Sequence, residues 1–276
     1  MDEIILDQLV ELVDAFHEIG IKPIICGGLG IYLSFYGRQS EVPLRTTNDI
    51  DLLLTKNQLL EESHRNAIAE TITNKLKYIA CESGRHFQFQ KGNQHLDILT
   101  QPVEGIEVEG FRAVLVRSKL HGHLMPEAVF IEENLKAVSL AHISPNSEMA
   151  KGLEVMIPSL TNQLILKLLA FDDRHQGLRK NDAQAQSHAF DIYMIVALAN
   201  LNDYKEGQKF LSRHNDSKIV QRAQSIVNSK FSSVEQPGWL YVLEAASFYP
   251  DRNIQQKRTR LDAAKRRLVR WFTVSP

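Results

Sequence analysis

Cysteine is scarce in this 276-residue chain. Its two cysteines, Cys26 and Cys81, lack the close paired spacing of zinc ligands. They also provide no disulfide framework, so a reducing cytoplasm is the expected compartment. No apolar run approaches the roughly 20 residues of a membrane span, and the first residues, MDEII, are acidic where an export signal would be basic. We therefore expect a soluble cytoplasmic protein without a membrane anchor.

An excess of charge of one sign is also missing. The chain has 32 Lys and Arg against 33 Asp and Glu, a formal net charge of -1. The whole molecule therefore has no electrostatic attraction to nucleic acid, and such a contact would need a local patch. Residues 255–270 concentrate basic side chains around a single acid, Asp262. This segment could contact an RNA backbone, but near-neutral net charge favours a solvated helix face.

Hydrophobic spacing alternates between helical and strand periods in the first half of the chain. It predicts helices over 2–20, 29–36 and 61–76, and strands over 21–26, 49–55, 85–90 and 94–100, with further short strands within 103–157. After Pro158 the spacing is helical over 160–171, 187–199, 204–213 and 217–229, and a polar loop is expected over 172–185. The fold class is thus α/β (α+β): a mixed sheet flanked by helices in a domain over 1–157, then a mostly helical domain over 158–276.

Two acidic residues occupy alternate positions of one predicted strand, with apolar residues between them, in the run Asp49-Ile50-Asp51-Leu52. Side chains of a strand alternate between faces, so Asp49 and Asp51 share one face while Ile50 and Leu52 point to the core. Two carboxylates on one face repel each other unless a cation lies between them, and Mg²⁺ prefers such oxygen ligands. The alternative is a solvated pair on an edge strand, but the apolar run that follows indicates a buried strand.

Asp97 lies within a second apolar strand, HLDILT, where an isolated acid is costly. If this strand neighbours the first, the three carboxylates converge on one metal site; otherwise Asp97 is a salt-bridged acid at a strand end. Gly27 and Gly28 precede a predicted helix. A turn without side chains there lets backbone N–H groups approach phosphate oxygens, although a double glycine also marks plain turns.

These features together resemble the polymerase β-like nucleotidyltransferase superfamily. The pattern is Gly27-Gly28, then Arg45-x-Thr47-x-Asp49-x-Asp51, then Asp97. The chain is most similar to the AbiEii/AbiGii-type toxin branch, because the second half contains a similar set of residues. These are Lys167 on a predicted helix, then Arg174, then Asp191 within the run HAFDI.

The resemblance implies transfer of a nucleoside monophosphate from a nucleoside triphosphate to an acceptor hydroxyl. It implies Mg²⁺ (two ions, with Mn²⁺ as an alternative) on Asp49, Asp51 and Asp97. It further implies that Lys167 binds phosphate and Asp191 organises the acceptor or the nucleotide, which makes both catalytic. The implied nucleotide-binding residues are Gly27, Gly28, Arg45, Thr47, Lys167 and Arg174. The implied partners are the nucleoside triphosphate, an acceptor tRNA or protein, and an antitoxin protein.

Other interpretations stay open. The acceptor could be a small molecule such as an aminoglycoside, or the chain could bind nucleotide without catalysis. Lys167 could be a snorkelling lysine on a buried helix, and Arg45 could pair with a carboxylate such as Asp51 instead of phosphate. His188 and Asp191 lie one helical turn apart, where a local hydrogen bond is common. The sequence assigns no role to Lys180, Asp182 or His188.

Overall fold

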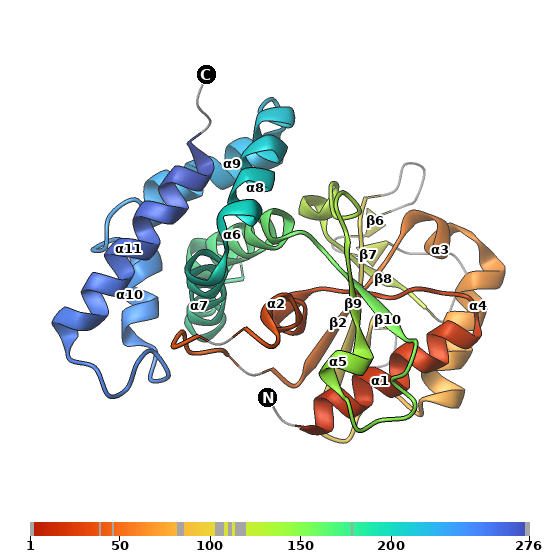
Figure 1. Ribbon diagram of the computed structural model, residues 1–276. Helices are drawn as coiled ribbons and strands as arrows, with labels where there is room; N and C mark the ends of the chain where they lie inside the picture. The colour runs from red at the N-terminus through yellow and green to blue at the C-terminus, as the bar shows by residue number, and fades with distance from the viewer. Residues whose placement is uncertain are drawn as a thin grey trace. The chain divides into compact units, whose positions relative to one another are not determined.

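A computed structural model describes residues 3–38, 40–45, 47–81, 86–102, 108–109, 112–113, 120–177 and 179–273. The chain forms two compact units. The sheet unit comprises Met1–Tyr36 and Thr46–Ser159, and the helical unit comprises Gly37–Arg45 and Leu160–Pro276. A mixed sheet with helices is followed by a mostly helical region, so the predicted α/β (α+β) fold class is confirmed (Figure 1). In the described part of the chain, no helix is both long and apolar enough to span a membrane.

The sheet unit contains a mixed ten-stranded sheet with the order β6-β7-β8-β5-β2-β1-β10-β9, in which β4 also pairs with β5, and β3 with β4. Its strands are β1 Ile24–Ile25, β2 Asp49–Leu54, β3 Ile79–Ala80, β4 Gln88–Lys91, β5 Gln94–Thr100, β6 Val108–Glu109, β7 Arg112–Ala113, β8 Gly122–Leu124, β9 Lys136–Ser139 and β10 Glu154–Ile157. Its helices are α1 Glu3–Glu18, α2 Gly27–Phe35, α3 Lys56–Leu60, α4 Glu62–Glu70, the π-helix η1 Thr71–Lys75, the 3₁₀ turn η2 Pro126–Ala128 and α5 Leu140–Ile143.

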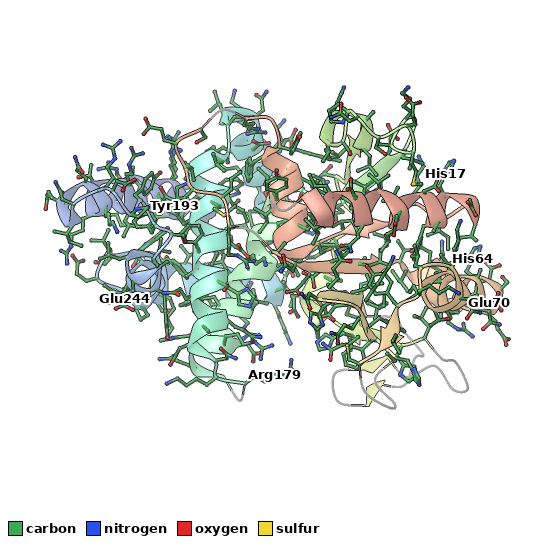
Figure 2. All side chains as sticks on the ribbon, turned by 90° about the horizontal axis from the view of Figure 1, so that it is seen from below. His17, His64, Glu70, Arg179, Tyr193 and Glu244 are labelled. Atoms are coloured by element: carbon green, nitrogen blue, oxygen red, sulfur yellow. The ribbon has the colours of Figure 1, made fainter. Side chains whose placement is uncertain are left out.

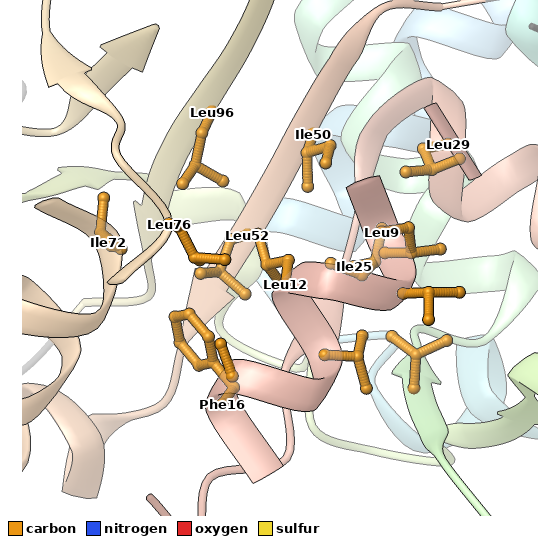
Figure 3. Close-up of a cluster of buried hydrophobic side chains, with 14 of the residues drawn as sticks. Leu9, Leu12, Phe16, Ile25, Leu29, Ile50, Leu52, Ile72, Leu76 and Leu96 are labelled. Atoms are coloured by element: carbon orange, nitrogen blue, oxygen red, sulfur yellow. The ribbon is translucent and has the colours of Figure 1, made fainter. Parts of the chain in front are cut away.

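One face of the sheet carries the hydrophobic core of this unit. Strand residues Ile50, Leu52 and Leu96 point into the core, where Leu9 and Phe16 of α1 are also fully buried (Figure 3). Each such side chain contributes about 1.5–3 kcal/mol through burial. Because alternate strand residues face opposite ways, this burial directs Asp49, Asp51 and Asp97 to the other face.

The structure confirms the predicted strand at 94–100 and the strand at 49–55 to within one residue. Other boundaries differ. The predicted strand at 21–26 is reduced to Ile24–Ile25 after Pro23, and the helix predicted over 61–76 is α-helical only to Glu70 and then becomes the π-helix η1. The strand predicted over 85–90 begins at Gln88, and Arg85 lies outside the described residues, as does much of 103–119.

The helical unit is built from α6 Leu160–Gln176, α7 Asp182–Leu198, α8 Leu201–Arg213, α9 Lys218–Ile226, the π-helix η3 Val227–Phe231, α10 Pro237–Glu244 and α11 Ile254–Phe272. The loop predicted over 172–185 was wrong at both ends. α6 continues to Gln176, and α7 already begins at Asp182, because the side chain of Asn181 accepts a hydrogen bond from the Gln184 N–H and caps the helix. Figure 2 labels Arg179, in the turn between these helices, and Tyr193 on α7.

Candidate active site

Strands β2 and β5 are parallel and adjacent, and their register brings two predicted carboxylates side by side. Asp51 pairs with Asp97, and Asp49 pairs with His95. Neighbouring strands lie about 4.8 Å apart, so these four side chains occupy one small area on the face opposite the core. The sheet therefore brings together Asp49, Asp51 and Asp97, as the sequence predicted.

The pKa of the Asp97 carboxyl is raised at this position. Burial and the neighbouring Asp51 raise its pKa to about 6, with a further contribution from Asp49, while a hydrogen bond from Gln88 and the charge of His95 lower it. The amide Nε2 of Gln88, on β4, lies 3.3 Å from Asp97 Oδ1. The repulsion anticipated from the alternating acids is thus present.

Gly27 lies directly against Asp51. It begins α2 with a φ of +63°, which favours glycine, and a Cβ atom there would lie 1.6 Å from Asp51 Oδ2. The N–H of Cys26 donates to the Asp51 carbonyl at 2.8 Å. No side chain caps α2 at Cys26. The start of α2, whose first N–H groups have no acceptor within the helix and carry partial positive charge, therefore adjoins the acidic strand.

The carboxylates fit a magnesium ion in their chemistry but do not form a closed cage. Among the described residues, no group of three or more His, Cys, Asp or Glu side chains is arranged to enclose a metal ion. Magnesium is usually bound by one or two carboxylates, with water and substrate phosphates completing its shell. The mutual repulsion at Asp97 is what a bound cation would relieve, so the donor set is suitable.

Thr47 and Arg45 precede the acidic strand. The Thr47 hydroxyl lies 3.2 Å from the Asp49 N–H and accepts its hydrogen bond, which shapes the entry to β2. Arg45 belongs to the helical unit and pairs with Asp191 there, with its Nε 2.9 Å from Asp191 Oδ1. Of the two alternatives for Arg45, pairing with a carboxylate is therefore observed, and the partner is Asp191.

Asp191 is fully buried between two cations. Its Oδ2 lies 2.7 Å from Lys167 Nζ and 3.2 Å from Arg45 Nη2. Together with the bond from Arg45 Nε to Oδ1, this makes the Arg45–Asp191 pair bidentate. Burial alone would raise the pKa of Asp191, but the charges of Lys167 and Arg45 outweigh it and hold that pKa below its usual range. The snorkelling interpretation of Lys167 was wrong, since its side chain is only 11% exposed and ends on Asp191.

Arg174 and His188 lie beside this ion cluster. His188 is one turn before Asp191 on α7, and Arg174 is two turns after Lys167 on α6. Burial, followed by the charge of Lys167, lowers the pKa of His188 to about 3, and Arg45 and Arg174 add to this effect. The predicted local bond between His188 and Asp191 is absent, because the buried Nδ1 of His188 has no hydrogen-bond partner among the described residues.

The basic segment forms α11, and most of its cations already have partners in the helical unit. Lys265 and Arg266 both pair with Asp262, at 2.7 and 2.8 Å. Arg267 donates to the carbonyl of Ala197 at 2.8 Å, near the end of α7, and Arg270 lies over the Tyr204 ring. This segment therefore has structural roles as well as a surface charge.

Sequence reasoning missed Gln88 and His188. Gln88 lies within the strand predicted over 85–90, but a glutamine there carries no signal of a functional role, and the pairing of β4 with β5 places it opposite Asp97. His188 was assigned no role because a single histidine on a helix carries no signal of its own. The two cations that flank it, Lys167 and Arg45, come from distant parts of the sequence.

Comparison with known proteins gave few matches. No family model matches the sequence, and no curated protein matches it significantly. Among solved structures, the chain is similar to the antibiotic-resistance factor ANT(2'')-Ia, with a TM-score of 0.38 and 14% identity, over 78% of this chain and 99% of that one. At such low similarity, a function has to be inferred from the chain's own residues.

Proposed function

We propose that the chain is a magnesium-dependent nucleotidyltransferase that moves a nucleoside monophosphate from a nucleoside triphosphate to an acceptor hydroxyl. The observation that carries this proposal is the register of β2 and β5, which sets Asp51 against Asp97 with Asp49 two residues away. A structural role does not explain three acids on one face beside a glycine that leaves room for one of them. A divalent cation would make the arrangement favourable.

Asp49, Asp51 and Asp97 would hold the metal, with Mn²⁺ able to replace Mg²⁺. When bound, two such ions polarise the attacking hydroxyl and neutralise charge on the departing pyrophosphate. Asp97 accepts the proton of the acceptor hydroxyl, and its pKa of about 6 suits a general base near neutral pH. Gln88 orients this carboxyl through its hydrogen bond.

The remaining predicted residues bind the nucleotide. The start of α2 at Gly27 and Gly28 adjoins Asp51, and its backbone N–H groups suit phosphate oxygens. Within the helical unit, Lys167, Arg45 and Arg174 supply positive charge for phosphate. Asp191 positions Lys167 and Arg45, because both of its oxygens are occupied by these two cations.

We propose an RNA acceptor such as tRNA, or a protein hydroxyl, in a toxin that an antitoxin would restrain. The engaged cations of α11 favour a second candidate, a small-molecule acceptor of the aminoglycoside kind, which needs no basic surface. A role in nucleotide binding without catalysis is the third candidate.

The test is transfer of label from each α-labelled nucleoside triphosphate, with Mg²⁺, to total tRNA, to protein or to aminoglycosides. Asp49→Asn/Asp51→Asn should abolish transfer, whereas Glu154→Gln, an exposed acid on β10, should leave it unchanged. Label that persists in the double variant would contradict the catalytic assignment. Nucleotide binding with no pyrophosphate released with any acceptor would favour the binding role.

Charge reversal separates the acceptor classes. Lys257→Glu/Arg258→Glu changes two cations of α11 that have no ion pair among the described residues. It should weaken transfer to RNA at least about tenfold at physiological salt and leave transfer to an aminoglycoside unchanged. Equal loss with both acceptors would indicate damage to the fold instead.

A further inference from the structure

His188 lies in an unusually cationic setting within the helical unit. The charged groups close enough to affect it are Lys167, Arg45, Arg174 and Asp191. These three cations and one acid have a summed formal charge of +2. A cluster of this kind favours an anionic ligand.

The ring itself has no hydrogen bond within the described chain. Its Nδ1 is buried without a partner, and its Nε2 is not among the buried unpartnered atoms. His188 is half-buried, so the ring has an inner and an outer nitrogen. No described group forms a hydrogen bond with either nitrogen, and Nδ1 is closed to solvent, so a ligand of this ring would bind through the outer Nε2.

The ring also has the right protonation state to serve as a selective donor. Burial, and then the charge of Lys167, lowers its pKa and keeps the ring neutral at physiological pH, so it has one N–H to donate and adds no further charge. A fixed neutral donor among Lys and Arg would orient a phosphate group that the cations attract without direction.

We propose that His188 donates a hydrogen bond to a phosphate group held by Lys167, Arg45 and Arg174, and is thereby a further nucleotide-binding residue. The inference rests on the proposed function only for the identity of that phosphate as part of a nucleoside triphosphate. Phosphate binding by the helical unit can be tested with no transfer reaction.

His175 provides a matched control. It is also half-buried on the same unit, with an unpartnered buried Nδ1 and a lowered pKa, caused first by burial. Its charged neighbours are balanced, with Lys230 and Lys180 against Asp182 and Asp172, and its ring stacks on Phe171 at 5.4 Å. It has the same chemistry as His188 without the cationic excess.

The experiment measures binding of inorganic tripolyphosphate to the full chain by calorimetry. His188→Leu should weaken the Kd at least about tenfold, since hydrogen bonds to charged groups are the stronger kind. His188→Gln, which restores a donor near the Nε2 position, and His175→Gln should both stay within about threefold of the parent chain. Unchanged affinity in His188→Leu would overturn the inference, as would no binding of tripolyphosphate by the parent chain.

A second readout does not depend on how well the Leu variant folds. In the parent chain with ¹⁵N-labelled histidine, the His188 ring signals, identified by their loss in His188→Gln, should shift on addition of tripolyphosphate while those of His175 stay in place. No shift at saturation would contradict direct contact. Tripolyphosphate binding that depends on His188, with no nucleotidyl transfer to any acceptor, would sustain this inference while refuting the proposed function.

Discussion

Asp97 carries a stability cost when no cation accompanies it. Its pKa in the folded chain is about 6, above the 3.8 of an unperturbed aspartate, so the folded state binds this proton more tightly than the unfolded state. The free energy of unfolding therefore falls as pH rises from about 4 to 6, and the cost is complete above that range. We predict that Asp97→Asn raises the free energy of unfolding at pH 7.5 by about 1–2 kcal/mol, abolishes transfer and has almost no effect on stability near pH 4. Urea titrations at both pH values measure this, and equal stabilisation at both would contradict it.

A bound cation should remove the same cost. We predict that Mg²⁺ raises the Tm of the parent chain more at pH 8 than at pH 5, because protonation of Asp97 competes with the metal at the lower pH. Differential scanning fluorimetry with MgCl₂ and with an equal ionic strength of NaCl measures the difference. Asp49→Asn/Asp51→Asn should show no Mg²⁺-specific shift, and a shift as large as that of the parent chain would place the ion elsewhere.

Gly27 combines two constraints, whereas Gly20 has one. Both have positive φ, +63° and +74°, but only at Gly27 would a Cβ meet another group, the carboxylate of Asp51. We predict that Gly20→Ala costs about 1–2 kcal/mol for its backbone alone, while Gly27→Ala costs more and also abolishes transfer by displacing Asp51. Chemical denaturation and the transfer assay together test this pair, and equal losses of stability with retained activity would contradict it.

At the scale of elements, strongly patterned strands were predictable, and the pairing of strands distant in the sequence was not. The alternation of Asp49, Ile50 and Asp51 determined which face each side chain takes, because burial of one face leaves no other choice. The pairing of β2 with β5, which brings Asp51 to Asp97, depends on contacts between segments far apart in the sequence that no local pattern encodes. The two-residue strand β3 is likewise held by its neighbour β4, and its own hydrophobic pattern is too short to define it.

Helices α6 and α7 are joined through the Asp191 ion cluster, so its loss should be structural as well as functional. Asp191→Ala leaves the buried Lys167 and the half-buried Arg45 without their counter-charge, and we predict a loss of about 3–5 kcal/mol in the free energy of unfolding. Asp172→Ala is the control, because its pair with Arg222 involves an Arg222 side chain that is 53% exposed and should contribute less than about 1 kcal/mol. Urea denaturation measures both variants. Similar losses in the free energy of unfolding would show that the Asp191 ion cluster does not hold α6 and α7 together.

For the whole molecule, the near-neutral net charge is the sum of opposite formal charges on the two units. The helical unit has 20 Lys and Arg against 12 Asp and Glu, a formal charge of +8, and the sheet unit has 12 against 21, a charge of -9. The net charge of -1 thus excludes an electrostatic attraction of the whole chain to nucleic acid, but it does not exclude an attraction of the helical unit. The acidic unit suits cations, and the basic unit suits phosphates.

This division predicts how transfer to RNA responds to salt. If RNA contacts the helical unit, KM for RNA should rise steeply between about 50 and 200 mM salt, because bound phosphates release counterions. KM for the nucleoside triphosphate should rise less, since fewer phosphates are involved. Lys257→Glu/Arg258→Glu should flatten the slope for RNA more than Lys265→Glu/Arg266→Glu, because Asp262 already neutralises part of the latter pair. Initial rates over a salt series measure both slopes, and equal slopes in parent and variants would mean that α11 does not contact the acceptor.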